Sequence, residues 1–335
     1  MSIAEGRGRL GLACALVAAA VALPFVAPGY YVQFAAKVML MGILAMALNL
    51  VVGFGGLVSL CHAAFFGLAG YVLALTSSRY EAASLWLTLP AAIGAAALAA
   101  LVIGALSLRT RGIYFIMVTL AFGQMLFYLF YDTQFAGGSD GAYIYFKPEV
   151  AIGGTVLVDL ERPRSFYLVV LALLVATLAG LGSLVRSPFG RALAAARDNE
   201  RRALSLGFPV YRIRLAAFTL SGALAGMSGY FAAAQFGFVA PQMLGWHLSA
   251  VVLVMVLLGG VGSVAGPLVG AFVLLGLEEV LKSWTPYWAL VEGAIIFAIV
   301  LALPGGVRQL AALALGRRGL EPGREPKPVA EPGRG

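Results

Sequence analysis

The chain has 335 residues, of which 61% are hydrophobic and 11% are charged, and its mean hydropathy is +0.94. This composition excludes a soluble globular domain and indicates an integral membrane protein, because nearly all the length falls into apolar stretches of about 20 residues, enough to cross a bilayer. The net charge of +8 does not indicate nucleic-acid binding, since the basic residues lie in short loops between spans and not on a face with interleaved aromatic residues.

Ten apolar stretches follow one another and predict an all-α, polytopic membrane fold with about ten transmembrane helices. The first follows Arg7 and Arg9 and is longer than the core of a signal peptide, so we count it as a span. Two joints, residues 53–56 and 262–267, are so short and glycine-rich that each is also compatible with a break inside one span. The predicted spans are residues 10–27, 34–52, 57–76, 85–108, 112–131, 166–185, 215–234, 247–264, 268–284 and 287–303.

The distribution of lysine and arginine indicates the orientation of these spans. With both termini in the cytoplasm, 17 basic residues fall on the cytoplasmic side and 6 on the outer side, in agreement with the positive-inside rule. The chain then consists of a membrane domain, residues 1–306, and a cytoplasmic tail, residues 307–335, whose composition predicts disorder. Two long loops result, a cytoplasmic one at residues 186–214 and an outer one at residues 132–165.

The cytoplasmic loop, residues 186–214, is the longest polar segment with helical character. It carries seven arginines against two acidic residues. Ser187 as N-cap, Pro188 at the first helical position and Gly207 as a stop signal predict one helix over residues 188–206. We expect this helix to lie outside the bilayer.

The sequence lacks several common motifs of catalysis. None of its four lysines follows a glycine, so it has no Gly-Lys-Ser/Thr phosphate-binding loop. It has no His-Glu-x-x-His pattern, and Cys14 and Cys61 have no metal-ligand spacing. We therefore expect a non-enzymatic chain that binds no cofactor or metal itself, and any energy from ATP must come through another subunit.

Polar residues and glycines in the apolar stretch at residues 49–71 are candidates for a solute pathway. Polar side chains deep in a membrane are costly unless they face a cavity or another helix, and glycine clusters free backbone groups that protein or water must satisfy. For His62 two interpretations stay open: a hydrogen-bonded contact between helices, which is the more common role, or a pathway residue. The candidates in this stretch are Asn49, Gly53, Gly55, Ser59 and His62.

Glu292 is a further pathway candidate, inside the last predicted span. A carboxylate within the membrane is a functional candidate by default, and a paired structural acid near the helix end is an equally open alternative.

Three blocks of sequence carry a family resemblance. The first is NLVVGFGGLVSLCHAAFFGLAGY at residues 49–71, and the second is RTRGIYFIMVTLAFGQM at residues 109–125 with the later GGSDG. The third is SPFGRALAAARDNERRALSLG at residues 187–207, which continues to GGVGSVAGP at residues 259–267. Together they resemble the permease subunits of bacterial ABC importers of the branched-chain amino-acid class, the LivM type, although that family generally has glycine in place of Cys61.

The resemblance covers most of residues 34–306 and implies that the third block couples the permease to an ATPase. Ala203 and Gly207 are spaced as in the Glu-Ala-Ala-x-x-x-Gly loop common in ABC permeases, whereas Arg201 and Arg202 replace its first two positions. An alanine-rich helix suits a groove on a soluble partner, with arginines meeting acidic groups at the rim. The expected ATPase-coupling residues are Arg191, Ala195, Arg197, Asn199, Glu200, Ala203 and Gly207.

The resemblance also implies partners, a location and a solute. We expect a chain of the bacterial inner membrane that pairs with a homologous second permease subunit (LivH type), two ATPase subunits that bind ATP-Mg, and a solute-binding protein that contacts the outer loop. The expected solute is leucine, isoleucine or valine. An importer of the same class for urea, short amides or aromatic acids is an alternative, as is an ion-coupled secondary transporter. That last class would require several buried acids, and Glu292 is nearly the only one.

Overall fold

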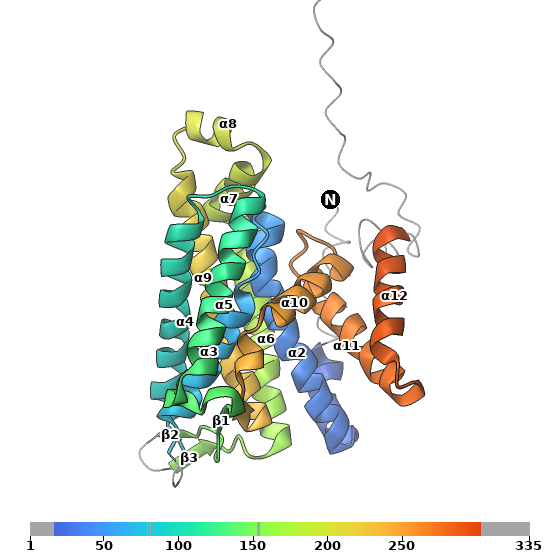
Figure 1. Cartoon of the computed structure of the whole chain (residues 1–335). Coiled ribbons are helices and arrows are strands. Elements are labelled where there is room, and N and C mark those ends of the chain that lie inside the picture. The colour runs from blue at the N-terminus through green and yellow to red at the C-terminus, as the bar shows by residue number, and fades with distance from the viewer. Residues whose placement is uncertain (1–16, 79, 81, 153–154, 303–335) are drawn as a thin grey trace, which may run out of the picture.

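The computed structural model describes residues 17–302 except 79, 81, 153 and 154, and this part of the chain is a bundle of helices (Figure 1). A short helix, Val17–Val26, comes first. The long helices are α2 (Gly29–Asn49), α3 (His62–Thr76), α4 (Leu85–Ser107), α5 (Ile113–Asp132), α6 (Pro163–Arg186), α9 (Val210–Phe236), α10 (Trp246–Gly259), α11 (Gly266–Trp284) and α12 (Trp288–Ala302). The π-helical turn Leu50–Phe54 extends α2, and two short helices, α7 (Pro188–Asp198) and α8 (Glu200–Ser205), lie between α6 and α9.

Five of these helices are long and apolar enough to cross a membrane: α2 with its π-helical extension, α4, α5, α6 and α9. The apolar helices Val17–Val26, α3, α10 and α12 are shorter. The fold is therefore an all-α membrane protein, as the composition predicts. Every predicted span overlaps one of these helices, but the number of spans, about ten, stays a prediction.

Two predicted span boundaries are wrong, and each lies beside a glycine-rich joint. Residues 57–61 are not helical, so α3 begins at His62 and not at residue 57. Helix α10 ends at Gly259 and not at residue 264, because the next residue, Gly260, has a φ of 97°. Such a positive φ interrupts a right-handed helix and is readily adopted by glycine alone. Both corrections place irregular backbone within a stretch of continuous apolar sequence.

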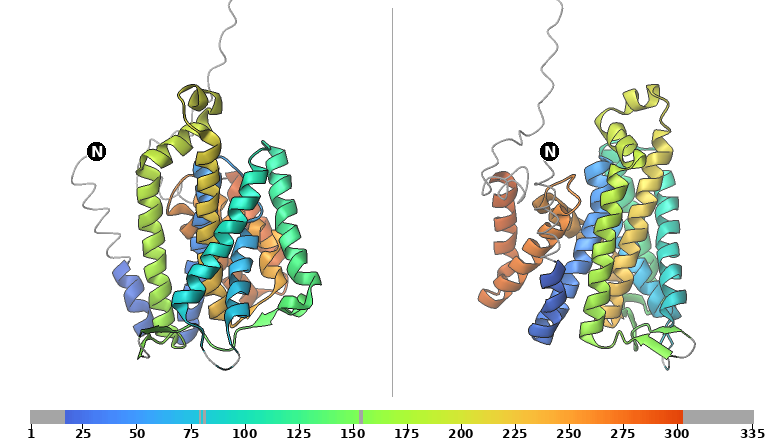
Figure 2. Two further views of the ribbon diagram at one scale, coloured as in Figure 1. Left: turned by 90° about the vertical axis from the view of Figure 1, so that its left-hand side faces the viewer. Right: turned by 180° about the vertical axis from the view of Figure 1, so that it is seen from behind.

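Helix α2 lies at the centre of the bundle. In its most apolar stretch 89% of the residues are buried, whereas only 22% are buried in the corresponding stretch of α5. Helix α2 packs against α6, α9, α10 and α11, and α3 packs against α4 and α9. Helix α12 lies at one edge of the bundle, and α4 and α5 lie at the opposite edge (Figures 1 and 2).

Small residues allow α9 to approach its neighbours closely. A Cβ atom added to Gly222 would lie 2.3 Å from the Cβ of Ala100, and one added to Gly226 would lie 2.4 Å from the Cβ of Ala96. Both alanines belong to α4. In a membrane, apolar side chains gain little by leaving lipid for each other, so the van der Waals packing that such close backbone contact allows favours helix association.

The two ends of the bundle differ in structure. At one end, here called the strand end, the loop at residues 132–165 forms short turns, which its glycines at residues 137–141 indicate, and strands that the sequence did not predict. At the other, here called the arginine-rich end, α7 and α8 stand beyond the long helices (Figure 2). The strand end contains the antiparallel pairs β1 (Ala142–Tyr143) with β4 (Phe238–Val239) and β2 (Val150–Ile152) with β3 (Thr155–Val158).

The predicted tail at residues 307–335 lies outside the described residues, as do the first residues of the first predicted span and the last residue of the final one.

Candidate functional site

The predicted cytoplasmic helix is in fact two helices, α7 and α8. Asn199 separates them with an extended conformation (φ −156°, ψ 96°), and its side chain caps α8 by accepting a hydrogen bond from the backbone N of Arg202 at 3.0 Å. The single helix predicted over residues 188–206 is therefore wrong in its middle. Its start is confirmed, because Ser187 Oγ accepts a hydrogen bond from the backbone N of Gly190 at 3.3 Å.

Gly207 ends α8 in the way that the sequence predicts. Its φ is 83°, and its backbone N donates to the carbonyl of Leu204 at 2.9 Å. The following N, of Phe208, donates to the carbonyl of Ala203 at 3.1 Å. This pair of bonds around a left-handed residue is a Schellman motif, which favours glycine at this position. No heavy atom of a neighbouring residue lies within 4 Å of an added Cβ on Gly207, so the site is open on its outer side.

Ion pairs fasten α8 to the rest of the bundle. Glu200 accepts from Arg214 of α9 at 3.1 Å and from Arg111 of the α4–α5 connection at 3.0 Å. The Arg214 side chain is 15% exposed and also donates to the carbonyl of Ala196 at 3.0 Å. Glu200, predicted as a residue that meets a partner, thus holds α8 against its own chain.

The seven predicted coupling residues do not share one surface. Ala203 lies in a small buried cluster with Ala196 and Val210, so it faces the start of α9 and not the solvent. The exposed members are Arg191, Arg197, Asn199 and Gly207, and Ala195 is half-buried.

The two glycine-rich breaks of the sequence meet at the arginine-rich end. Asn49, the last residue of α2, donates from Nδ2 to the carbonyl of Ser263 at 2.8 Å and accepts at Oδ1 from the backbone N of Gly262 at 3.2 Å. A Cβ added to Gly53 would lie 2.6 Å from that same N of Gly262. The break after α2 and the break after α10 are therefore in direct contact with each other.

Arg197 of α7 joins this contact. Its Nη1 donates to the carbonyl of Gly53 at 2.6 Å, and its Nε and Nη2 donate to Oδ1 of Asp198 at 2.9 and 2.8 Å. A Cβ added to Gly56 would lie 2.6 Å from the Cγ of Arg197. We call the residues that meet here the glycine junction: Asn49, Gly53, Gly56, Arg197, Gly262 and Ser263.

Hydroxyl side chains from neighbouring helices satisfy the irregular backbone before and at the start of α3. The backbone N of Leu60 donates to Oγ1 of Thr119 on α5 at 3.4 Å, and the backbone N of Ala63 donates to Oγ of Ser249 on α10 at 3.0 Å. Backbone groups freed within a membrane must find such partners in protein or in a water-filled cavity. For these two groups the partner is protein.

His62 is fully buried between α3 and α9. Its Nε2 lies 2.7 Å from Oγ of Ser221, which donates its own proton to the carbonyl of Ala47, so Nε2 is the donor to the serine. The rings of Phe65 and Phe218 contact the imidazole edge-on, with centroids 5.7 Å away in each case. This arrangement favours the first of the two interpretations, a hydrogen-bonded contact between helices.

A packing role for His62 predicts different effects for two substitutions. His62→Ala removes the donor to Ser221 and leaves a cavity, so we expect the permease level in the membrane to fall severalfold, consistent with a loss of about 2–4 kcal/mol of stability. His62→Gln keeps an N–H donor and most of the volume, so the level should largely recover. In both variants the KM for solute should match that of the unaltered protein. An altered KM at an unaltered protein level would instead support the pathway role.

The other pathway candidates do not form one site. Ser59 Oγ lies 3.2 Å from Sγ of the buried Cys61, and Gly55 is packed so closely that an added Cβ would lie 2.7 Å from the carbonyl oxygen of Val51. Glu292 is half-buried on α12, at the edge of the bundle, while His62 lies on α3 in its interior. The structure brings together Asn49 and Gly53 but not Glu292 and His62.

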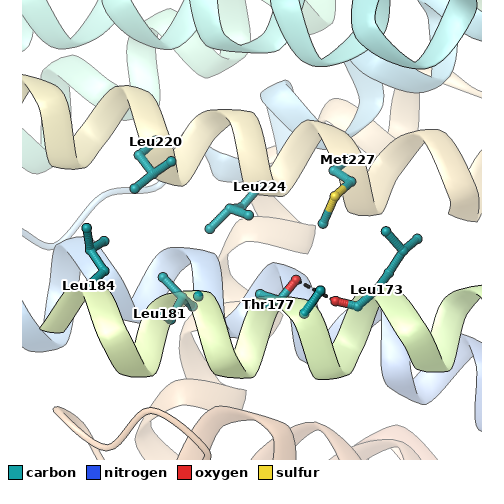
Figure 3. A pocket seen from close by; sticks show the side chains of 9 residues that line it. Leu173, Thr177, Leu181, Leu184, Leu220, Leu224 and Met227 are labelled. Atoms are coloured by element: carbon teal, nitrogen blue, oxygen red, sulfur yellow. Dashed lines mark hydrogen bonds between the residues drawn. The ribbon is translucent and has the colours of Figure 1, made fainter. Parts of the chain in front are cut away.

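A cavity of about 320 Å³ opens between α6 and α9 (Figure 3). Its only lining side chain with a polar atom is Thr177, whose hydroxyl donates to the carbonyl of Leu173 at 2.8 Å. The ammonium and carboxylate of an amino acid would find no charged partner among the lining residues. The cavity therefore does not suit an amino-acid site. Its lining residues are Leu173, Ala176, Thr177, Gly180, Leu181, Leu184, Leu220, Leu224 and Met227.

Comparison with known proteins shows to which family the chain belongs. Residues 30–302 match the family described as "Branched-chain amino acid transport system / permease component". The chain belongs to this family. The match includes α2 to α12 from the second residue of α2 onward, and with them the glycine junction, α7 and α8.

Two relatives within this permease family cover most of the chain. They are the high-affinity branched-chain amino acid transport system permease proteins LivM of Escherichia coli strain K12 and of Salmonella typhimurium strain LT2. Each is 34% identical over 312 residues, which is 88% of this chain and 73% of the relative.

A shorter stretch of the chain is also similar to a permease that is named for a different solute. The autoinducer 2 import system permease protein LsrC of Klebsiella pneumoniae is 41% identical over 160 residues, 45% of each chain. No solved structure matches the chain.

Several residues that shape the site were not singled out from the sequence. Thr119, Ser221 and Ser249 bond the α3 region from three different helices, and Arg214 anchors α8. The three hydroxyl residues carry the same signal as Ser59, a polar side chain inside an apolar span. Extending that criterion to every span of this permease would have found them.

Proposed function

We propose that this chain is the membrane-spanning permease subunit of an ATP-driven ABC importer of the bacterial inner membrane, and that its solute is a branched-chain amino acid. The observation that carries the proposal is the 34% identity to the LivM permeases over 88% of the chain. The projecting, arginine-rich α7–α8 segment agrees with it, because a subunit without its own phosphate-binding loop needs a contact surface for an ATPase.

The proposal assigns a partner to each end of the bundle. At the arginine-rich end, the exposed Arg191 and Gly207 of the α7–α8 segment face the cytoplasm and dock onto one of two ATPase subunits, which bind ATP-Mg. At the strand end, the loop at residues 132–165 contacts a solute-binding protein. A homologous second permease subunit of the LivH type completes the membrane part, with the solute pathway between the two subunits.

A second solute class has one observation in its favour. LsrC, which is named for autoinducer 2 import, is similar to nearly half of this chain, so a shared permease fold accompanies different solutes. Urea, short amides and aromatic acids are the further alternatives within the importer class. An ion-coupled secondary transporter is the least supported alternative, because the ten predicted spans contain only three acidic residues, Glu278, Glu279 and Glu292, and Glu278 is paired with Lys282.

Competition against labelled leucine distinguishes these solutes. Uptake is measured in cells that lack the gene and in the same cells carrying it, with an excess of one unlabelled compound in each assay. We expect gene-dependent uptake of leucine that isoleucine and valine inhibit and that urea, acetamide and phenylalanine do not. Gene-dependent uptake of one of the other compounds, with none for leucine, would replace the branched-chain assignment.

A further inference from the structure

The glycine junction suggests how movement of α7 reaches the interior of the permease. We propose that Arg197 is the positioning residue that transmits displacement of α7 to the two glycine breaks, the π-helical end of α2 and the turn at residues 260–265. This inference rests on the function proposed above, because it assumes that an ATPase moves α7.

The first argument is the hydrogen bond that Arg197 supplies to the broken backbone. After the π-helical turn, the backbone N of Gly55 donates to the carbonyl of Leu50 at 3.2 Å, and the N of Leu57 donates to the carbonyl of Val51 at 3.0 Å. The carbonyl of Gly53 accepts from the Arg197 guanidinium at 2.6 Å. A charged donor to a carbonyl freed by a helix break makes a strong and specific contact.

The second argument is the close packing at two glycines of the junction. An added Cβ would lie 2.6 Å from Arg197 Cγ if placed on Gly56, and 2.6 Å from the Gly262 N if placed on Gly53. Real Cβ atoms do not approach that closely, so Arg197 and the two glycine segments are in direct van der Waals contact. The Arg197 side chain is exposed on its other side, but a shift toward the glycines finds no gap and must displace the backbone beside it.

The third argument is that the two breaks are tied to each other. Asn49 bonds to both Gly262 and Ser263, so displacement at the end of α2 carries the α10–α11 turn with it. Irregular turns accommodate changes of backbone angle more easily than regular helices do. The two glycine breaks can therefore act as a hinge. Asp198 holds the guanidinium with two hydrogen bonds and thereby keeps it aimed at Gly53.

The test separates docking of the ATPase from transmission of its movement. The permease is purified with its partner subunits from cells that carry the native protein, Arg197→Gln, Arg197→Lys or the control Arg212→Gln. Arg212 is an exposed arginine in the first turn of α9, so its substitution removes the same charge from the same end of the bundle. For each protein we measure the amount of ATPase that copurifies, the rate of ATP hydrolysis and the uptake of labelled leucine per molecule of permease.

We expect Arg197→Gln to retain the ATPase and its hydrolysis while uptake falls about tenfold or more, which corresponds to loss of one charged hydrogen bond. Arg197→Lys keeps a donor for Gly53 but loses the planar fork, so its uptake should be intermediate, and Arg212→Gln should resemble the native protein. Normal uptake by Arg197→Gln, loss of its ATPase, or equal uptake by the Lys and Gln variants would each overturn the proposal. Failure of the native protein to take up solute with ATP would instead contradict the proposed function.

Discussion

Replacing Gly229 by valine is expected to abolish accumulation of the folded protein in the membrane. A Cβ at this position would lie 1.9 Å from the carbonyl oxygen of Phe66 and 2.5 Å from its carbonyl carbon. Both are backbone atoms of α3, so no side-chain rotation can relieve the overlap, and α3 and α9 would have to separate. The cost exceeds the roughly 1–3 kcal/mol typical of overpacking and is comparable with a total stability of about 5–15 kcal/mol. The measurement is the amount of protein in isolated membranes together with its thermal unfolding in detergent.

Gly182→Val is the matched control for this prediction. Gly182 is also a glycine within a long helix, α6, but no neighbouring heavy atom lies within 4 Å of an added Cβ. We expect this variant to accumulate at nearly the native level. Normal accumulation of Gly229→Val, or equal losses in both variants, would contradict the close packing of α3 on α9.

Replacing Gly207 by arginine is expected to remove ATP-dependent uptake while the protein stays in the membrane. The φ of 83° costs a residue with a side chain about 1–2 kcal/mol, and the new side chain adds bulk and charge at the exposed end of α8. Because nothing lies within 4 Å of an added Cβ, the substitution does not disturb the helix bundle. We expect uptake to fall at least about tenfold, since a loss of 1.4 kcal/mol of coupling already corresponds to that factor, and the copurifying ATPase to fall with it.

Gly207→Asn provides the control for this second prediction. Asparagine tolerates a left-handed conformation better than other residues with side chains and carries no charge. The Schellman motif should persist and uptake should stay near the native value. Normal uptake by Gly207→Arg would contradict the assignment of the α7–α8 segment as the docking site.

Local sequence signals predicted the ends of the α7–α8 segment but not its middle. Ser187 and Gly207 act through bonds to residues within four positions along the chain, so the sequence alone contains their partners. Asn199 interrupts the helix because its side chain competes with the backbone for hydrogen bonds and caps the next turn instead. An asparagine within a stretch of alanines and arginines does not by itself distinguish these two outcomes.

The lengths of the apolar stretches predicted where the helices lie but not the residues at which α3 begins and α10 ends. Residues 57–61 look like part of a span because they are apolar, and their irregular backbone is stabilised by Thr119, which lies far away in the sequence. The contact of Arg197 with Gly53 joins residues 144 positions apart. Such contacts depend on how the helices pack, so the sequence indicated two glycine breaks and a basic segment without indicating that the three meet.

Uptake of labelled leucine in cells with and without the gene, with ATP depleted while the proton gradient is kept, tests the central claim most directly. We predict uptake that depends on the gene and disappears when ATP is depleted, because this subunit obtains its energy from ATPase partners docked at α7 and α8. Gene-dependent uptake that survives ATP depletion would contradict the importer assignment and favour an ion-coupled transporter.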